Sequence, residues 1–137
     1  QDFEHRRQWM LDRLAEIERV FCIKVCTYAI MSNHYHLVLY INKKEVDSLS
    51  DQEVIERWRR IYKGPDVIQR FVAGEKLSKE HHGLIAEIVA KWRERLEDIS
   101  WFMRALNEPI ARQANYEDSC TGHLYSPPSM ALTLRVS

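Results

Sequence analysis

The spacing of apolar residues changes near residue 22 and divides the chain into segments of different secondary structure. Before this point apolar residues recur every three or four positions, which predicts a helix over about residues 3–20. Its expected core-facing residues are Met10, Leu14, Ile17 and Phe21. Dense β-branched and aromatic residues then predict strands at 22–31 and 34–41. The two residues between the strands, 32–33, favour an antiparallel hairpin.

The rest of the chain up to residue 110 has helical spacing. Ser50 and Glu53 match the capping box, in which each side chain satisfies a backbone amide of the other residue at a helix start. Glycine, proline and other breakers separate the helical segments that follow. We predict helices at about 50–62, 66–72, 78–96 and 99–110. The third of these should bury Leu84, Ile88, Trp92 and Leu96.

The predicted hairpin needs further strands, because an isolated hairpin is only marginally stable in water. Its second strand is apolar on both faces, which is typical of an interior strand. The tail at 126–137 contains two prolines and shows neither the helical nor the strand period of apolar residues, so we expect it to be irregular. The alternative is that residues 131–136 form a third strand. The expected fold class is therefore α+β, with the hairpin in a sheet and several helices packed around it.

The composition is typical of a single globular domain. Of 137 residues, 45% are hydrophobic and 29% charged, and the formal net charge is zero. No apolar run is long enough for a membrane and no signal-peptide pattern opens the chain, so we expect a cytoplasmic protein without membrane contacts. Three cysteines without a C-x-x-C pair argue against a disulfide framework or a zinc knuckle. We expect Cys22 and Cys26 to be small buried side chains.

Basic residues cluster at 57–63 and at 91–95. A protein that binds the nucleic-acid backbone usually has an excess of positive charge, which the zero net charge of this chain does not provide. Charge alone therefore favours the solvated faces of amphipathic helices over DNA contacts.

His34 and His36 are the main candidates for chemistry. They are two residues apart in a predicted strand, so both side chains lie on one face, roughly 6–7 Å apart along the strand. Two neutral imidazoles on one face form half of a metal site, which normally needs a third ligand. The alternative is a pair of partly buried histidines that only pack and hydrogen-bond. The predicted register sets Met31 opposite His34 and Ala29 opposite His36, which leaves space over the imidazoles.

Several sequence motifs around the histidines, in the order found in a known protein family, support a functional role for His34 and His36. The segment Tyr28–Leu39 (YAIMSNHYHLVL) resembles the His-hydrophobic-His segment of IS200-like, single-tyrosine transposases, a group that includes the REP-associated tyrosine transposases. Further stretches that resemble one bacterial branch of this family are Phe3–Trp9 (FEHRRQW), Ser100–Arg104 (SWFMR), Asn107–Asn115 (NEPIARQAN) and the glycine turn Cys120–Gly122. The resemblance covers about residues 2–125, and several motifs in order are more specific than a lone H-x-H.

The resemblance implies a metal-assisted reaction on DNA. His34 and His36 would bind Mg²⁺ or Mn²⁺, which polarises the scissile phosphate of single-stranded or hairpin DNA. A tyrosine hydroxyl would attack and leave a 5′-phosphotyrosine and a free 3′-hydroxyl, so that strands can be rejoined. Tyr125 is the candidate nucleophile after the glycine turn, Tyr116 is the alternative before it, and the third metal ligand is unassigned. The residues expected to contact DNA are Arg59, Arg104, Asn107 and Arg112.

The resemblance also implies a domain organisation. Residues 1–125 would form an incomplete IS200-like transposase domain, with a partial ferredoxin-like antiparallel sheet that carries the histidine hairpin, and 126–137 would form an irregular tail. The family's first strand and its nucleophile segment have no clear counterpart, so we expect a domain truncated at both ends. The competing function is a catalytically inactive DNA-binding remnant of such a transposase. Both a monomer and a homodimer remain open.

Overall fold

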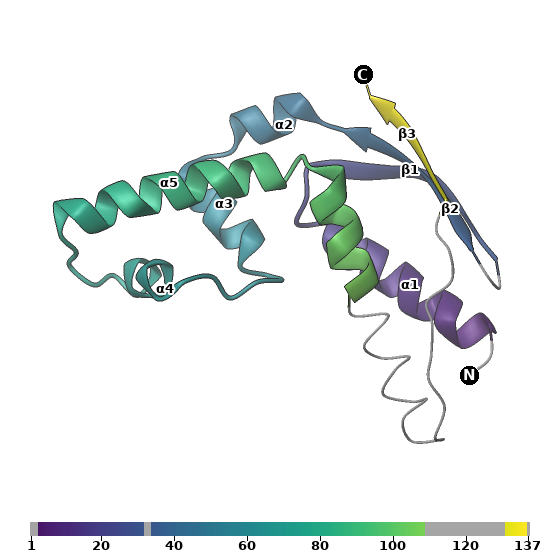
Figure 1. The fold of residues 1–137 in the computed structure, drawn as a ribbon, viewed down its shortest axis with the longest axis horizontal. Coiled ribbons are helices and arrows are strands. Elements are labelled where there is room, and N and C mark those ends of the chain that lie inside the picture. The colour runs from purple at the N-terminus through teal and green to yellow at the C-terminus, as the bar shows by residue number, and fades with distance from the viewer. Residues whose placement is uncertain (1–2, 32–33, 109–130, 137) are drawn as a thin grey trace.

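The computed structural model describes residues 3–31, 34–108 and, for the backbone alone, 131–136. The chain has an α+β fold in which some of the helices pack against one small sheet and the others pack together to one side of it (Figure 1). In chain order the elements are α1 (Phe3–Glu18), β1 (Ile23–Ile30), β2 (Tyr35–Ile41), α2 (Lys43–Ser48), α3 (Asp51–Trp58), α4 (Asp66–Val72), α5 (Lys79–Arg95), a helical segment at 99–108, and β3 (Ala131–Val136). Within these ranges no helix combines the length and the apolar character that crossing a bilayer requires.

The sheet has the strand order β1-β2-β3, so β2 is its central strand. β1 and β2 pair antiparallel, with Ala29 opposite His36 as predicted. β3 pairs parallel with β2, so the sheet is mixed. The prediction of a sheet that is antiparallel throughout is therefore wrong. Parallel neighbours need a long crossover connection, and here that connection includes α2 to α5. The expectation of an irregular tail at 126–137 is corrected for Ala131–Val136, which form the strand that the sequence had left as an alternative.

Successive residues of β2 alternate between a buried and a more exposed face. Tyr35, Leu37 and Leu39 are at most 1% exposed, whereas His36 between them is exposed. The buried side chains join one core with residues from the helices, among them the predicted α1 residues Met10, Leu14, Ile17 and the following Phe21. The helices therefore cover the face of β2 opposite to His36.

β1 contains a β-bulge at Cys26, which has no register partner in β2. The flanking register pairs are Val25 with Leu39 and Thr27 with Val38. Cys22 is buried as predicted, but Cys26 is exposed. The prediction of a buried Cys26 is wrong because the strand alternates: Ile23 and Val25 face the core, so Lys24 and Cys26 lie on the exposed face.

Local sequence signals locate several helix starts correctly. Ser50 and Glu53 make both hydrogen bonds of the predicted capping box at the start of α3. The predicted helix at 66–72 has the bounds of α4, and Ser78 caps α5. These helices begin where a side-chain oxygen or a proline provides a local start signal.

Two helical features differ from the prediction. The six-residue α2, capped by Asn42, was not predicted, because two turns are too short to establish a helical period. α5 buries Trp92 and Leu96 as predicted, but in its first half the buried residues are Ile85 and Val89, while the predicted Leu84 is 45% exposed. The predicted pattern was misleading because apolar residues occupy both neighbouring faces of this helix.

Candidate metal and nucleic-acid site

His34 and His36 lie together at the start of the central strand. His36 belongs to β2, whereas His34 precedes it by one residue, because the strand pairing begins with Ile30 and Tyr35. The His34 carbonyl accepts a 2.8 Å hydrogen bond from the Met31 N–H, which holds it beside the end of β1. The two imidazole centroids are 5.4 Å apart, with an interplanar angle of 85°. His34 is half-buried and His36 exposed, so the pair is accessible.

Small residues flank His36 in the sheet. Its register partners are alanines on both sides, Ala29 in β1 and Ala131 in β3. Directly opposed residues have Cβ atoms about 5 Å apart, so large residues at these positions would crowd the imidazole. A ligand that approaches His36 meets no bulky residue type at either register position.

Tyr35 lies between the two histidines in sequence but on the opposite face of the strand. Its ring is 1% exposed, and its hydroxyl donates a 2.9 Å hydrogen bond to Oδ1 of Asn107 in the segment 99–108. Burial raises the pKa of the Tyr35 hydroxyl well above its ordinary value, and the hydrogen bond to Asn107 only partly opposes this. Asn107, which the sequence predicts to contact DNA, therefore accepts a hydrogen bond from Tyr35 on the face of β2 opposite to the imidazoles.

The other predicted DNA contacts differ in exposure. Arg104 is exposed, and its guanidinium carbon lies 4.8 Å from the centre of the Trp101 ring. Arg59, half-buried after the end of α3, donates a 3.5 Å hydrogen bond from Nε to the Lys63 carbonyl. Arg112 lies outside the described residues. Among the predicted contacts that the structure describes, Arg104 is thus the exposed residue.

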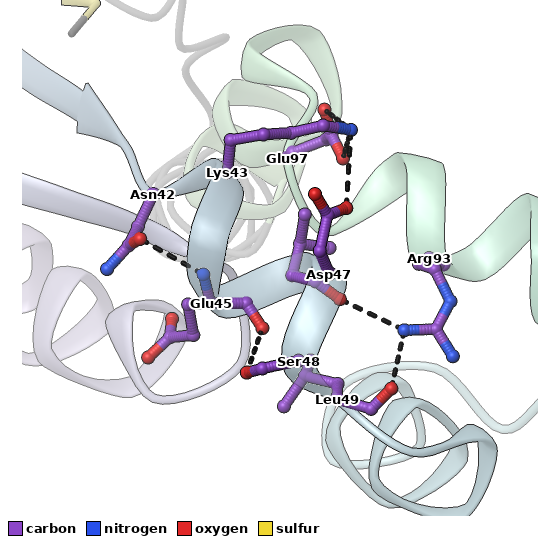
Figure 2. Close-up of polar contacts among 9 residues, drawn as sticks. Asn42, Lys43, Glu45, Asp47, Ser48, Leu49, Arg93 and Glu97 are labelled. Carbon is purple, nitrogen blue, oxygen red and sulfur yellow. Dashed lines mark hydrogen bonds and ion pairs between the residues drawn. The ribbon is translucent and has the colours of Figure 1, made fainter.

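Arg93, from the second basic cluster, joins α5 to the end of α2. Its Nη1 donates to the carbonyls of Val46 and Leu49 at 2.9 and 2.7 Å, and its Nη2 pairs with Asp51 at 2.8 Å. Figure 2 shows Arg93 reaching across from α5 toward Leu49. Its side chain is only 26% exposed, so the interpretation of this cluster as a solvated helix face is wrong for Arg93.

Arg57, from the first basic cluster, is also used inside the protein. It pairs with Glu45 at 3.6 Å, and its Nη1 donates to the Cys22 sulfur at 3.6 Å. Burial raises the pKa of the Cys22 thiol to about 12, an effect that a hydrogen bond to Glu45 reinforces and the Arg57 charge opposes. The Arg57 charge is therefore held within the fold, where it supports the junction of α2, α3 and β1.

The described residues do not include every residue that the sequence predicts for the site. No third His, Cys, Asp or Glu forms a ligand group with the histidine pair among residues 3–31 and 34–108. The predicted nucleophile Tyr125, and Tyr116, lie outside the described residues. Sequence reasoning overlooked Tyr40, which is half-buried in β2. Its even spacing from His36 places it on the same face of the strand and is the signal that could have identified it.

Comparisons with known proteins identify no relative of this chain. No family model matches it, and no match was found among the curated proteins or the solved structures.

Proposed function

We propose that this chain carries the metal site of a DNA-processing enzyme of the single-tyrosine transposase class. The observation that carries the proposal is the pair of imidazoles, 5.4 Å apart on the accessible side of β2. Two nitrogen ligands, with alanines at both register positions beside His36, fit a divalent cation that must also meet a phosphate. The resemblance of the surrounding motifs to IS200-like transposases supports the same assignment.

The proposed reaction nicks and rejoins single-stranded or hairpin DNA. His34 and His36 would hold Mn²⁺ or Mg²⁺, which supplies polarisation of the scissile phosphate when bound. A tyrosine hydroxyl, proposed to be that of Tyr125, attacks phosphorus, and the 3′-oxygen of the DNA leaves with a proton. The resulting 5′-phosphotyrosine retains the energy of the broken bond, so a 3′-hydroxyl can reverse the step and rejoin a strand.

We assign α1, β1 and β2 to the helix-strand-strand part of a ferredoxin-like domain, within a transposase domain at 1–125. The antiparallel pairing of β1 with β2 supports this assignment, as does the packing of α1 opposite to the histidine face. The exposed Arg104 is the proposed phosphate contact on the helical side.

The first test measures Mn²⁺ binding by calorimetry and by manganese electron paramagnetic resonance. A variant with His34→Ala and His36→Ala should bind Mn²⁺ at least about tenfold more weakly than the wild type, because both nitrogen ligands are lost. The matched control replaces His81 and His82, two histidines at the start of α5, and should bind like the wild type. Equal Mn²⁺ affinity in all three proteins would remove the metal assignment.

The second test follows cleavage of a labelled single-stranded DNA hairpin with Mn²⁺. Covalent protein–DNA adducts should form with the wild type and disappear in Tyr125→Phe, which lacks the attacking hydroxyl. Tyr40→Phe is the comparison, because Tyr40 lies on the histidine face of β2. Loss of the adduct in Tyr40→Phe alone would reassign the nucleophile.

The alternative function is a DNA-binding remnant that does not cleave. The observation that favours it is the exposed residue Arg104, in a described part of the chain that brings no third ligand group to the histidines. Binding to single-stranded DNA should then weaken steeply with salt, and Arg104→Ala should lower the salt slope by about one phosphate contact. Binding with an unchanged slope in Arg104→Ala would reject this role of Arg104.

A further inference from the structure

A groove between α3, α4 and α5 has no part in the proposed DNA chemistry. Its volume is about 570 Å³. In Figure 1, α4 and the start of α5 lie on the far side of the molecule from the sheet. Any ligand in this groove would therefore leave the histidine pair accessible.

The groove has a buried apolar floor and an exposed apolar edge. Ile55, Ile85 and Val89 form the floor and are at most 6% exposed. Phe71 and Val72, at the end of α4, also line the groove but are 38% and 50% exposed. Large apolar side chains that remain in water beside a hollow are characteristic of surfaces that another molecule covers.

The charge of the groove restricts what can cover it. Its lining includes the carboxylates of Asp51 and Glu56 and the imidazole of His82, but neither lysine nor arginine. Asp51 is paired with Arg93, whereas Glu56 accepts a 3.2 Å hydrogen bond from the neutral amide of Gln52. This lining disfavours a phosphate backbone and complements a partner that carries positive charge next to apolar residues.

We propose that this groove binds a basic amphipathic helix of a partner protein. The apolar stripe of that helix would cover Phe71 and Val72 above the floor, and its lysine or arginine residues would lie beside Glu56. Helices recognise apolar grooves through anchors spaced at i, i+3, i+4 and i+7, and the walls here are themselves helices rather than an open strand edge. The eight-residue α3 is about 12 Å long, so a partner helix of two to three turns would span this wall.

The experiment titrates the full chain with a synthetic peptide of about 15 residues, with leucines at helical spacing and lysines elsewhere. Calorimetry gives the Kd, and amide NMR shifts locate the binding site. The strongest shifts should map to α3, α4 and α5. A peptide with glutamate in place of lysine should bind at least about tenfold more weakly, and so should a scrambled peptide of unchanged composition.

Matched substitutions separate the groove from the rest of the helical surface. Val72→Lys and Glu56→Lys should each raise the Kd at least about fivefold. The controls Leu84→Lys and Glu87→Lys introduce the same residue on exposed positions of α5 that do not line the groove, and they should leave the Kd within about twofold. Unchanged thermal unfolding curves would show that all four variants fold.

Four outcomes would overturn the proposal. The scrambled peptide could bind as tightly as the patterned one, or the α5 controls could weaken binding as much as the groove variants. Self-association of the wild type that Val72→Lys abolishes would make a second copy of the chain the occupant. Shifts in α3 to α5 caused by a single-stranded oligonucleotide would make the groove a nucleic-acid site.

Discussion

The Tyr35 hydroxyl donates a 2.9 Å hydrogen bond to Oδ1 of Asn107, across a separation of 72 residues in sequence. This bond ties the residue between the two histidines to the segment 99–108 on the other side of the strand. Because Tyr35 is 1% exposed, its hydroxyl depends on a protein partner for the hydrogen bond that water would otherwise provide. The segment 99–108 thereby holds the start of β2 from the face opposite to the histidines.

Tyr35→Phe should lower the free energy of unfolding by about 1 kcal/mol, because the ring still packs but the hydrogen bond is lost. Asn107→Asp keeps the acceptor oxygen and should cost less than Asn107→Leu, which removes it. Urea unfolding monitored by circular dichroism measures all three. Wild-type stability in Tyr35→Phe together with a large loss in Asn107→Leu would show that Asn107 acts through other contacts.

Three glycines should respond differently to alanine. Gly64→Ala should cost about 3 kcal/mol, because its φ of +81° is strained for alanine and the new Cβ would lie 2.8 Å from Cη2 of Trp92. Gly74→Ala has a similar φ of +82° but open space, so it should cost about 1 kcal/mol. Gly83→Ala, inside α5 with no atom within 4 Å, should add about 1 kcal/mol of stability.

The same unfolding measurement ranks the three glycine variants. Equal costs at Gly64 and Gly74 would mean that Trp92 moves aside, and that only the backbone conformation matters.

Cys22 and Cys26 should differ in thiol reactivity. The pKa of Cys22 is raised to about 12, chiefly by burial, whereas Cys26 is exposed at the bulge. In a Cys120→Ser variant at about pH 8, Cys26 should react with a disulfide reagent at least about a hundredfold faster than Cys22, because the thiolate is the reactive form. Absorbance of the released thiol follows both reactions. A fast phase that survives Cys26→Ser would contradict the assignment.

Glu53 should make the cap of α3 sensitive to acid. Its pKa is lowered, first by the hydrogen bond from the Ser50 backbone N–H and then by the bond to the Ser50 side chain. A carboxylate with a lowered pKa in the folded state adds stability above its ordinary pKa of about 4.3, and this stability is lost as the pH falls through the folded-state value. Glu53→Gln should therefore lose less stability than the wild type between about pH 6 and pH 3.

Ser50→Ala is the control for this effect. Ser50→Ala retains the backbone N–H that donates a hydrogen bond to the Glu53 carboxylate. Most of the pH dependence should therefore remain, even though the loss of the Ser50 hydroxyl weakens the cap of α3 by about 1 kcal/mol. Chemical unfolding at several pH values compares the variants. A wild-type pH response in Glu53→Gln would assign the acid sensitivity elsewhere.

Sequence reasoning worked where the signal is local. The capping box of Ser50 and Glu53 and the bounds of α4 follow from neighbouring residues, and the register of Ala29 with His36 follows from a short connection. The orientation of α5 was harder, because apolar residues occupy adjacent faces and only packing selects Ile85 over Leu84. Long-range partners could not be read from a pattern: the uses of Asn107 and Arg93 depend on residues far away in sequence.

The residues of the candidate site were likewise predictable where the signal is local, and not where it depends on distant parts of the chain. The two-residue period of a strand identifies His34 and His36 as neighbours. The same period places Tyr40 on their face of the strand, but the motif around the histidines does not point to it. Ala131 could not be predicted beside His36, because the parallel pairing of β3 depends on a crossover through most of the chain. The groove between α3, α4 and α5 depends on how three helices pack, which a pattern within one helix does not specify.

The bulge at Cys26 has a consequence for how this chain can change in length. Val25 already pairs with Leu39 and Thr27 with Val38, so deleting residue 26 would convert the bulge into regular strand and leave every other pair in place. Deleting a residue nearer the turn would also use up the extra residue of the bulge, but the residues between position 26 and the deletion would then exchange faces. Position 26 is therefore the point in β1 where a single residue can be lost while every other residue keeps its face and Ala29 stays opposite His36.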